Sequence, residues 1–65
     1  MIKTAIKSAD GMVMVFDDRG EQIPQYQGRY DEVKVSILRD ALPEARFGCF
    51  PDGELELRIV PREEW

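Results

Sequence analysis

One stretch of the chain, between Gly28 and Pro43, places its hydrophobic and polar residues at helical spacing. At about 100° per residue, its apolar residues fall within one half of the circumference and its polar residues within the other. The apolar half holds Tyr30, Val33, Ile37, Leu38, Ala41 and Leu42, and the polar half holds Glu32, Ser36, Arg39 and Asp40. So wide an apolar half is typical of a helix lying on a sheet. We therefore predict a single helix, with Gly28 as its N-cap and Pro43 ending it.

In the segment before the helix, apolar and polar residues alternate with a period of two, which predicts a β-hairpin. Residues 2–7 alternate, and the set on one face is Ile2, Thr4 and Ile6. Asp10 and Gly11 supply the turn, because Asp favours local hydrogen bonds and Gly accepts a positive φ. Residues 12–16 follow as a strand that is apolar on both faces.

The segment between this hairpin and the helix has two interpretations. Residues 17–20 form a second turn signal, and Pro24 ends whatever regular structure follows it. Residues 21–23 are therefore either a short third strand beside residues 12–16 or part of the loop that leads to the helix.

The chain after the helix predicts a second hairpin. Residues 45–50 form a strand, and the turn Pro51-Asp52-Gly53 places Gly53 in the left-handed conformation. The next strand is one-sided, with Leu55, Leu57 and Ile59 alternating against Glu54, Glu56 and Arg58. Pro61 ends it, and residues 62–65 are expected to form a short, mobile tail.

These elements predict one α+β domain over residues 1–65. Short loops make hairpin partners antiparallel neighbours, and one helix covers only one face of a sheet. The expected fold is therefore an antiparallel sheet of four or five strands with one helix packed on one face, in the order ββ(β)αββ.

Composition narrows the classes of function. A 65-residue chain buries only about 60% of its unfolded surface, so its stability margin is small. With one cysteine and no histidine, we expect neither an internal disulfide nor a zinc site to stabilise the fold. Oligomerisation is the remaining common support. Nine basic and 13 acidic residues give a net charge of −4, which disfavours nucleic acid as a partner. There is no long apolar run and no signal peptide, so we expect no membrane partner and a cytoplasmic location.

No residue pattern predicts a catalytic, cofactor or metal site. Residues 17–21 are acidic like a calcium loop, but Arg19 interrupts the ligands, Gly20 comes too early, and the twelfth residue is Gly28. Cys49 has no histidine to activate it and is expected to be a small core residue beneath the helix. We therefore expect that the protein is not an enzyme.

Two features are candidate partner-binding sites. The first is the group Tyr26, Arg29 and Tyr30, because Tyr and Arg are enriched in protein interfaces. In the structural alternative, Tyr30 belongs to the core and Tyr26 pins the loop to the sheet. The second feature is the strand that is apolar on both faces.

In this strand, Val13 and Val15 lie on the uncovered face if Met12, Met14 and Phe16 face the helix. The opposite register exchanges the two sets. The structural alternative is a central strand whose outer residues are shielded by the long side chains of Lys3, Lys7 and Arg58.

The function expected from the sequence is that of a small intracellular protein-interaction module, with a weak homodimer among its possible forms. The alternative is an acidic protein that mimics nucleic acid and binds a basic surface of another protein. Carboxylates gathered on one face would favour the mimic, and an uncovered apolar patch would favour the interaction module.

Overall fold

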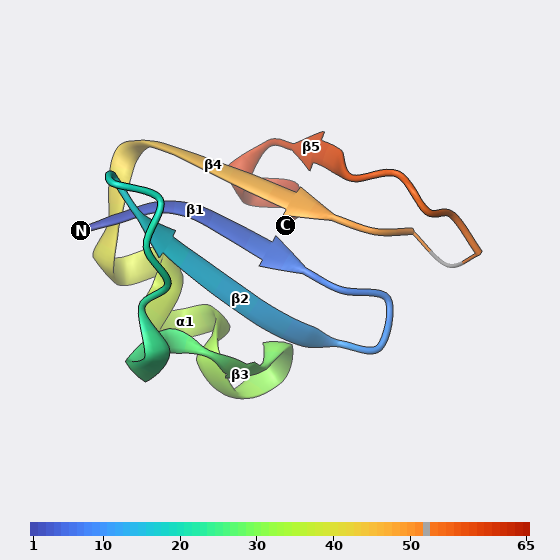
Figure 1. The fold of residues 1–65 in the computed structure, drawn as a ribbon, viewed down its shortest axis with the longest axis horizontal. Helices are drawn as coiled ribbons and strands as arrows, with labels where there is room; N and C mark the ends of the chain where they lie inside the picture. Colours follow the sequence, from blue (N-terminus) through green and yellow to red (C-terminus); the bar gives the residue numbers. More distant parts are fainter. Residues whose placement is uncertain (52) are drawn as a thin grey trace.

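A computed structural model describes residues 1–51 and 53–65 and has the expected α+β architecture (Figure 1). Its elements are β1 (Ile2–Lys7), β2 (Met12–Asp17), the 3-10 turn η1 (Pro24–Tyr26), β3 (Gly28–Arg29), α1 (Tyr30–Asp40), β4 (Ala41–Cys49), β5 (Arg58–Val60) and the 3-10 turn η2 (Arg62–Glu64). The strands form one five-stranded sheet in the order β3-β2-β1-β4-β5. The helix α1 contacts β1, β2 and β3, so one helix packs on one face of the sheet as predicted.

The sheet is mixed, so the expectation of a purely antiparallel sheet is wrong. The two hairpins, β1 with β2 and β4 with β5, are antiparallel as predicted, but the central pair β1 and β4 is parallel. The physical reason is the connection through α1. It returns the chain to the end of the sheet where β1 begins, so β4 runs beside β1 in the same direction.

The first hairpin follows its turn chemistry but not the predicted alternation along β1. Gly11 has a φ of 86°, and its N–H donates to the Ser8 carbonyl at 3.0 Å. A register shift between Ile2 and Thr4 changes which residues share a face. Ile2 and Ala5 are therefore the buried residues of β1, instead of Ile2 with Thr4 and Ile6.

Residues 21–23 form no strand and belong to the loop that leads to the helix, as one of the two interpretations had it. Gln22 makes one isolated bridge with Phe16, and the additional strand is Gly28–Arg29, which pairs with β2. Arg29 is the N-cap of α1, so the assignment of Gly28 to that position is wrong. Gly28 has a φ of 152° within β3, which an L residue rarely adopts.

The helix ends at Asp40, two residues earlier than predicted, and β4 begins at once. Ala41 is already extended, with φ −69° and ψ 144°, one residue before Leu42, the position that Pro43 restricts directly. The register between β1 and β4 shifts from Ile2 opposite Ala41 to Thr4 opposite Arg46. The residues between these two pairs therefore form a bend, and Pro43 lies within it.

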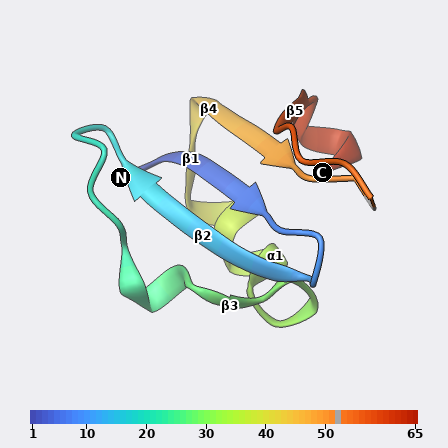
Figure 2. The same cartoon turned by 45° about the vertical axis from the view of Figure 1, so that its right-hand side comes forward.

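The second hairpin pairs over fewer residues than predicted. Only Arg58–Val60 forms β5, and the segment 53–57, which we call the arm, extends past the end of β4 (Figures 1 and 2). Gly53 has a φ of 77°, which confirms its left-handed conformation. Asp52, predicted within the same turn, lies outside the described residues. The Glu54 N–H donates to the Pro51 carbonyl at 3.0 Å, so this turn occupies residues that would otherwise extend the ladder.

The C-terminal residues belong to the core, and the expectation of a tail at 62–65 is wrong. Trp65 is 5% exposed, and its ring lies 5.0 Å from the ring of Phe47 and 5.3 Å from that of Tyr30, between centroids. Its indole Nε1 donates to the Gly48 carbonyl at 2.8 Å. The buried hydrophobic residues are Ile2, Ala5, Val13, Val15, Ile37, Phe47 and Trp65. Trp65 thus completes the core beside α1. None of the helices in the described ranges is both long and apolar enough to cross a membrane.

Candidate functional site

The two faces of the sheet follow from the strand register. Ala5 lies opposite Val15 on one side and opposite Phe47 on the other, and all three are buried on the face that α1 and Trp65 cover. The neighbouring positions point to the other face, which we call the open face. By register the open face holds Thr4 and Ile6 of β1, Met12, Met14 and Phe16 of β2, Arg46 and Gly48 of β4, and Ile59 of β5.

The placement of Val13 and Val15 on the uncovered face is wrong. Val13 is 2% exposed and Val15 is fully buried, whereas Met12 and Met14 are 44% and 38% exposed. The reason is the pairing of Val15 with Ala5, which sets the valines beneath α1. The two valine side chains are therefore closed to a partner, and the methionines occupy the open face.

The apolar surface continues across β4 and β5. Gly48 lies opposite Ile59, which is 55% exposed, and Leu57 packs over Gly48. A Cβ at Gly48 would lie 2.9 Å from Leu57 Cδ1, so the glycine makes room for this contact. The half-buried Phe50 follows β4, and its N–H donates to the Lys7 carbonyl at 3.1 Å. The strand alternation therefore places Phe50 on the open face too.

Two of the long side chains expected to shield this face lie elsewhere. Lys7 is opposite Val13 and Cys49, and its Nζ lies 4.0 Å from the centroid of the Tyr30 ring, on the helix side. Arg58 is opposite Cys49, and its guanidinium donates to Glu54 at 3.2 Å. Neither side chain covers the methionines of β2.

The residues predicted to cluster at the helix entrance do not form one surface. Tyr30 is half-buried, and its hydroxyl donates to the carbonyl of Trp65, which agrees with the interpretation of Tyr30 as a core residue. Arg29 is exposed and has its Nε 3.9 Å from an oxygen of Asp31. Tyr26 points instead to the far end of α1, where its hydroxyl donates to Asp40 Oδ2 at 2.6 Å. The hydroxyl of Tyr26 therefore ties the loop to the helix, while the rest of the side chain packs against the core of the sheet.

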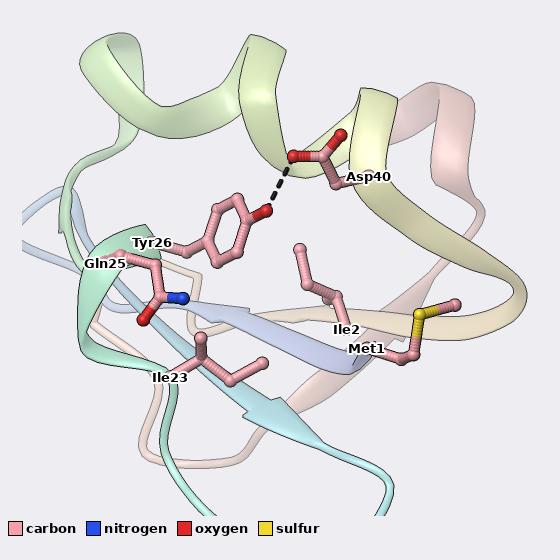
Figure 3. A pocket seen from close by; sticks show the side chains of 6 residues that line it. All are labelled: Met1, Ile2, Ile23, Gln25, Tyr26 and Asp40. Carbon is pink, nitrogen blue, oxygen red and sulfur yellow. Dashed lines mark hydrogen bonds between the residues drawn. The ribbon is translucent and has the colours of Figure 1, made fainter.

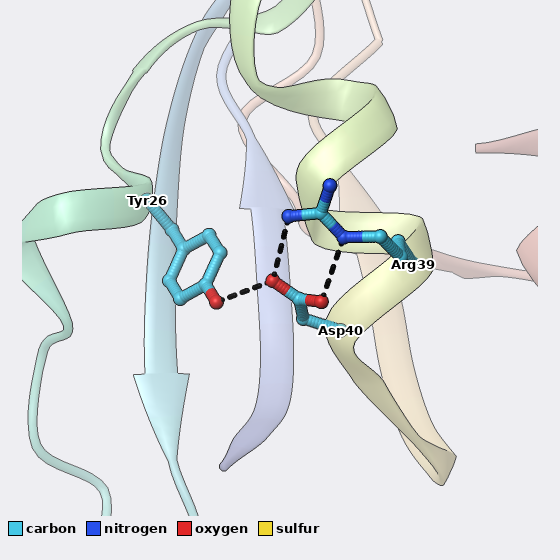
Figure 4. Close-up of polar contacts among 3 residues, drawn as sticks. All are labelled: Tyr26, Arg39 and Asp40. Carbon is cyan, nitrogen blue, oxygen red and sulfur yellow. Dashed lines mark hydrogen bonds and ion pairs between the residues drawn. The ribbon is translucent and has the colours of Figure 1, made fainter.

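Asp40 is the centre of a small polar network (Figure 4). Arg39 donates to both carboxylate oxygens, at 2.9 and 3.2 Å, and Tyr26 donates to one of them. The hydrogen bonds from Arg39, and next the one from Tyr26, lower the pKa of Asp40 to about 2. The same bond to Asp40 raises the pKa of Tyr26, since a phenolate would lie beside a carboxylate. Near neutral pH, Asp40 is therefore charged and Tyr26 neutral, which suits a structural link and not proton transfer.

A pocket of about 360 Å³ opens beside this network, between η1 and the start of β1 (Figure 3). Its lining is Met1, Ile2, Ile23, Gln25, Tyr26 and Asp40. The carboxylate of Asp40 already accepts the three hydrogen bonds described above, so little of its acceptor capacity is left for a ligand. The pocket walls are about equally polar and apolar.

Cys49 and the acidic residues provide no second site. Cys49 is half-buried at the end of β4, on the same side of the strand as Phe47. It is not one of the buried core residues, so the expectation of a core residue beneath the helix is wrong. Among residues 1–51 and 53–65, no group of three or more Cys, Asp or Glu side chains is placed to hold a metal ion. The described carboxylates lie on separate elements, among them the two turns that flank β2, the first turn and the end of α1, β4, the arm and η2.

The strongest candidate site is therefore the open face, and the sequence predicted its strand but not its residues. The signal was present in residues 12–16, where both alternating sets are apolar. Which set faced outward depended on the pairing with β1 and on the face of the sheet that α1 covers. Comparisons of the chain with protein-family models, curated proteins and solved structures found no match.

Proposed function

We propose that the protein is a protein-interaction module whose binding surface is the open face of the sheet. The observation that supports this is a set of large apolar side chains on the face opposite α1. They are Ile6, Met12, Met14, Phe16, Phe50, Leu57 and Ile59. A monomeric soluble protein rarely exposes a contiguous apolar surface of this kind, and such surfaces mark interaction sites.

The chemistry of the face defines the partner it suits. Among the described residues, Arg46 is the one charged residue that the strand pairings place on this face. The face therefore suits a largely apolar protein surface with an acidic group near one edge. Methionine side chains adapt to irregular surfaces, and aromatic residues and Met are enriched in interfaces. We propose the cytoplasm as the location and a binding role without catalysis.

The acidic mimic gains no supporting observation. Its partner would be a basic surface, which requires carboxylates to gather on one face. Here they lie on several separate elements, and the open face is apolar. The interaction module is therefore the better supported of the two functions.

Site-specific photo-cross-linking tests the proposal. A benzophenone amino acid at Ile59, on the open face, is compared with the same group at Val35, which is 74% exposed on the outer side of α1. Irradiation of each variant, purified and in an extract of its own organism, should give discrete protein adducts from position 59 and few from position 35. Equal yields from the two positions, or no adduct from position 59, would contradict the proposal. Circular dichroism checks that both variants are folded.

A further inference from the structure

We infer that the outer edge formed by the arm and β5 pairs with the same edge of a second copy of this chain, in an antiparallel ladder with Leu57 of each copy opposite Leu57 of the other. This edge is separate from the open face, so the inference goes beyond the proposed function and does not depend on it. β5 is the last strand of the sheet, and within the described residues its strand partner is β4 alone (Figure 1). Such an edge can pair with an extended segment of another chain through main-chain hydrogen bonds.

The arm has the residue pattern of a strand but lacks a ladder partner. Residues 54–60 alternate between charged and apolar side chains throughout, whereas the pairing with β4 covers residues 58–60. In the described ranges, the Glu54 N–H donates to the Pro51 carbonyl, and residues 55–57 make no backbone hydrogen bond. Leu55 is 96% exposed. The arm therefore offers both the backbone groups and the alternating side chains that strand pairing requires.

The charges of this segment match in one symmetric register. With Leu57 on the two-fold axis, Glu56 of each copy lies opposite Arg58 of the other, and symmetry produces this pair twice. Leu55 lies opposite Ile59 in the same register. Opposite charges and apolar side chains directly across a ladder both stabilise it. The Glu56 side chain is exposed and forms no ion pair within the described ranges, so its charge is available to a second copy.

The neighbouring registers lack this match. An axis at Glu56 places two glutamates opposite each other, and an axis at Arg58 places two arginines opposite each other, which destabilises a ladder. A slip of one residue sets the leucines of one copy against the charged residues of the other. Charges on an edge strand usually discourage pairing. Here their signs leave one register in which each Glu56 and Arg58 faces an opposite charge.

Pairing changes one contact within each copy. The chain bends at Glu56, and Arg58 Nη2 donates to both carboxylate oxygens of Glu54, at 3.2 and 3.3 Å. To extend the ladder, the arm straightens at this bend, and Arg58 exchanges Glu54 for Glu56 of the second copy. The side chains of Arg58 and Glu54 are 63% and 48% exposed. An ion pair so exposed contributes little to stability and therefore opposes the exchange only weakly.

Disulfide trapping tests the register. In a Cys49→Ser background, Leu57→Cys places the two new thiols on the axis, where the Cα atoms of opposite residues are about 4.5–5.5 Å apart, a separation that a disulfide spans. With oxidised glutathione as the oxidant, this variant should form a covalent dimer. A mixture of the Leu55→Cys and Ile59→Cys variants, in the same background, should form a mixed disulfide.

Leu55→Cys alone is the matched control. Leu55 is 96% exposed and Leu57 42%, so random collisions favour the control. In the proposed register, however, the two copies of residue 55 are about 13 Å apart, which is too far for a disulfide. The control should therefore give much less covalent dimer than Leu57→Cys. A yield from the control that equals or exceeds that of Leu57→Cys overturns the register.

Sedimentation equilibrium measures association without a cross-link. The wild-type mass should rise from that of a monomer to that of a dimer and not further, because the two-fold ladder uses the edge of both copies. A contact along one strand is smaller than a standard interface, so we expect a dissociation constant of about 10–1,000 μM. A wild-type chain that stays monomeric at a concentration of about 1 mM overturns the inference.

A charge exchange tests the pair across the ladder. Arg58→Glu and Glu56→Arg should each weaken association about three- to tenfold, because each variant places like charges opposite each other twice. The variant with both substitutions should recover most of the wild-type affinity, whereas additive losses overturn the inference. Circular dichroism checks that each variant is folded.

These outcomes are distinct from those that test the proposed function. Ile59 adjoins the edge, so an adduct between two copies from a benzophenone at position 59 reports the ladder, and an adduct with a different protein reports the open face. In purified protein, where the chain itself is the one partner present, position 59 should give the adduct between two copies at concentrations that favour the dimer. The absence of this adduct at those concentrations overturns the ladder.

Discussion

The two sides of β2 are both apolar, but they differ strongly in solvent exposure. Val13 and Val15 on one side are almost completely buried, while Met12 and Met14 on the other side keep about two fifths of their surface exposed. Valine is stiff at χ1 and packs well in a fixed environment, whereas methionine adapts to varied surfaces. An apolar position in a small sheet can therefore serve the core or an interface. Side-chain shape and strand pairing, rather than hydrophobicity, distinguish the two roles.

The largest expected effect comes from placing charges on the two sides of β2 in turn. Val13→Lys combined with Val15→Glu buries two charged groups beneath α1 and should abolish cooperative folding. The matched variant, Met12→Lys with Met14→Glu, alters the open face and should keep the fold. Circular dichroism and thermal melting at low concentration measure both. A folded valine variant would mean that the assignment of the two faces is reversed.

Substitution of Trp65 tests whether the C-terminal residues belong to the core on the helix-covered side. Trp65→Ala removes its contacts with Phe47 and Tyr30 and leaves the Gly48 carbonyl without its donor, so the free energy of unfolding should fall by about 3–5 kcal/mol. Urea denaturation measures the change. Glu63→Ala, in the exposed part of the same turn, should cost less than about 0.5 kcal/mol. Equal stability of the two variants would restore the interpretation of 62–65 as a tail.

Gly53 controls the turn from which the arm reaches the open face. Its φ of 77° strains any residue with a Cβ, so Gly53→Val should destabilise the protein by about 1–2 kcal/mol. Gly53→Asn should cost less, because Asn tolerates the left-handed region better. Thermal melting compares the two, and an unchanged melting temperature for the valine variant would show that the turn is built differently.

The smallest effect concerns the network at Asp40, on the helix side. Its pKa is lowered from 3.8 to about 2 in the folded protein, so its contribution to stability is fully present above pH 3.8 and is lost as the pH falls through 2. The stability difference between the wild type and Asp40→Asn should therefore shrink between about pH 4 and pH 2. Tyr26→Phe removes one of the hydrogen bonds and should give an intermediate profile. Urea titrations across this range measure the change, and a pH-independent difference would contradict the assignment.

Local chemistry allowed much of the fold to be predicted. The spacing of Tyr30, Val33 and Ile37 identified the helix, and the glycines at 11 and 53 take the positive φ that their turns require. The errors came from contacts between residues far apart in sequence. The pairing of β2 with β1 and the face of the sheet that α1 covers decide which side of β2 is buried, and no local pattern encodes which face the helix covers.

Trp65 was mistaken for part of a tail for the same reason. Its buried position depends on Phe47 and Tyr30, which lie 18 and 35 residues away in the chain. The candidate site was predicted as a strand because residues 12–16 are apolar throughout, but its residues were assigned to the wrong side. The pairing that corrects the assignment is a property of the whole sheet.

The most direct test of the binding face is the solvent exposure of the methionine methyl groups. The chain has three methionines: Met12 and Met14 lie on the open face, and Met1, which is 73% exposed, is away from it. With ¹³C-methyl methionine and a paramagnetic cosolute, all three signals should broaden in dilute protein. As an extract of the source organism is added, Met12 and Met14 should become protected while Met1 stays broadened. If all three stay equally exposed in the extract, the open face binds no other protein, and the account is wrong.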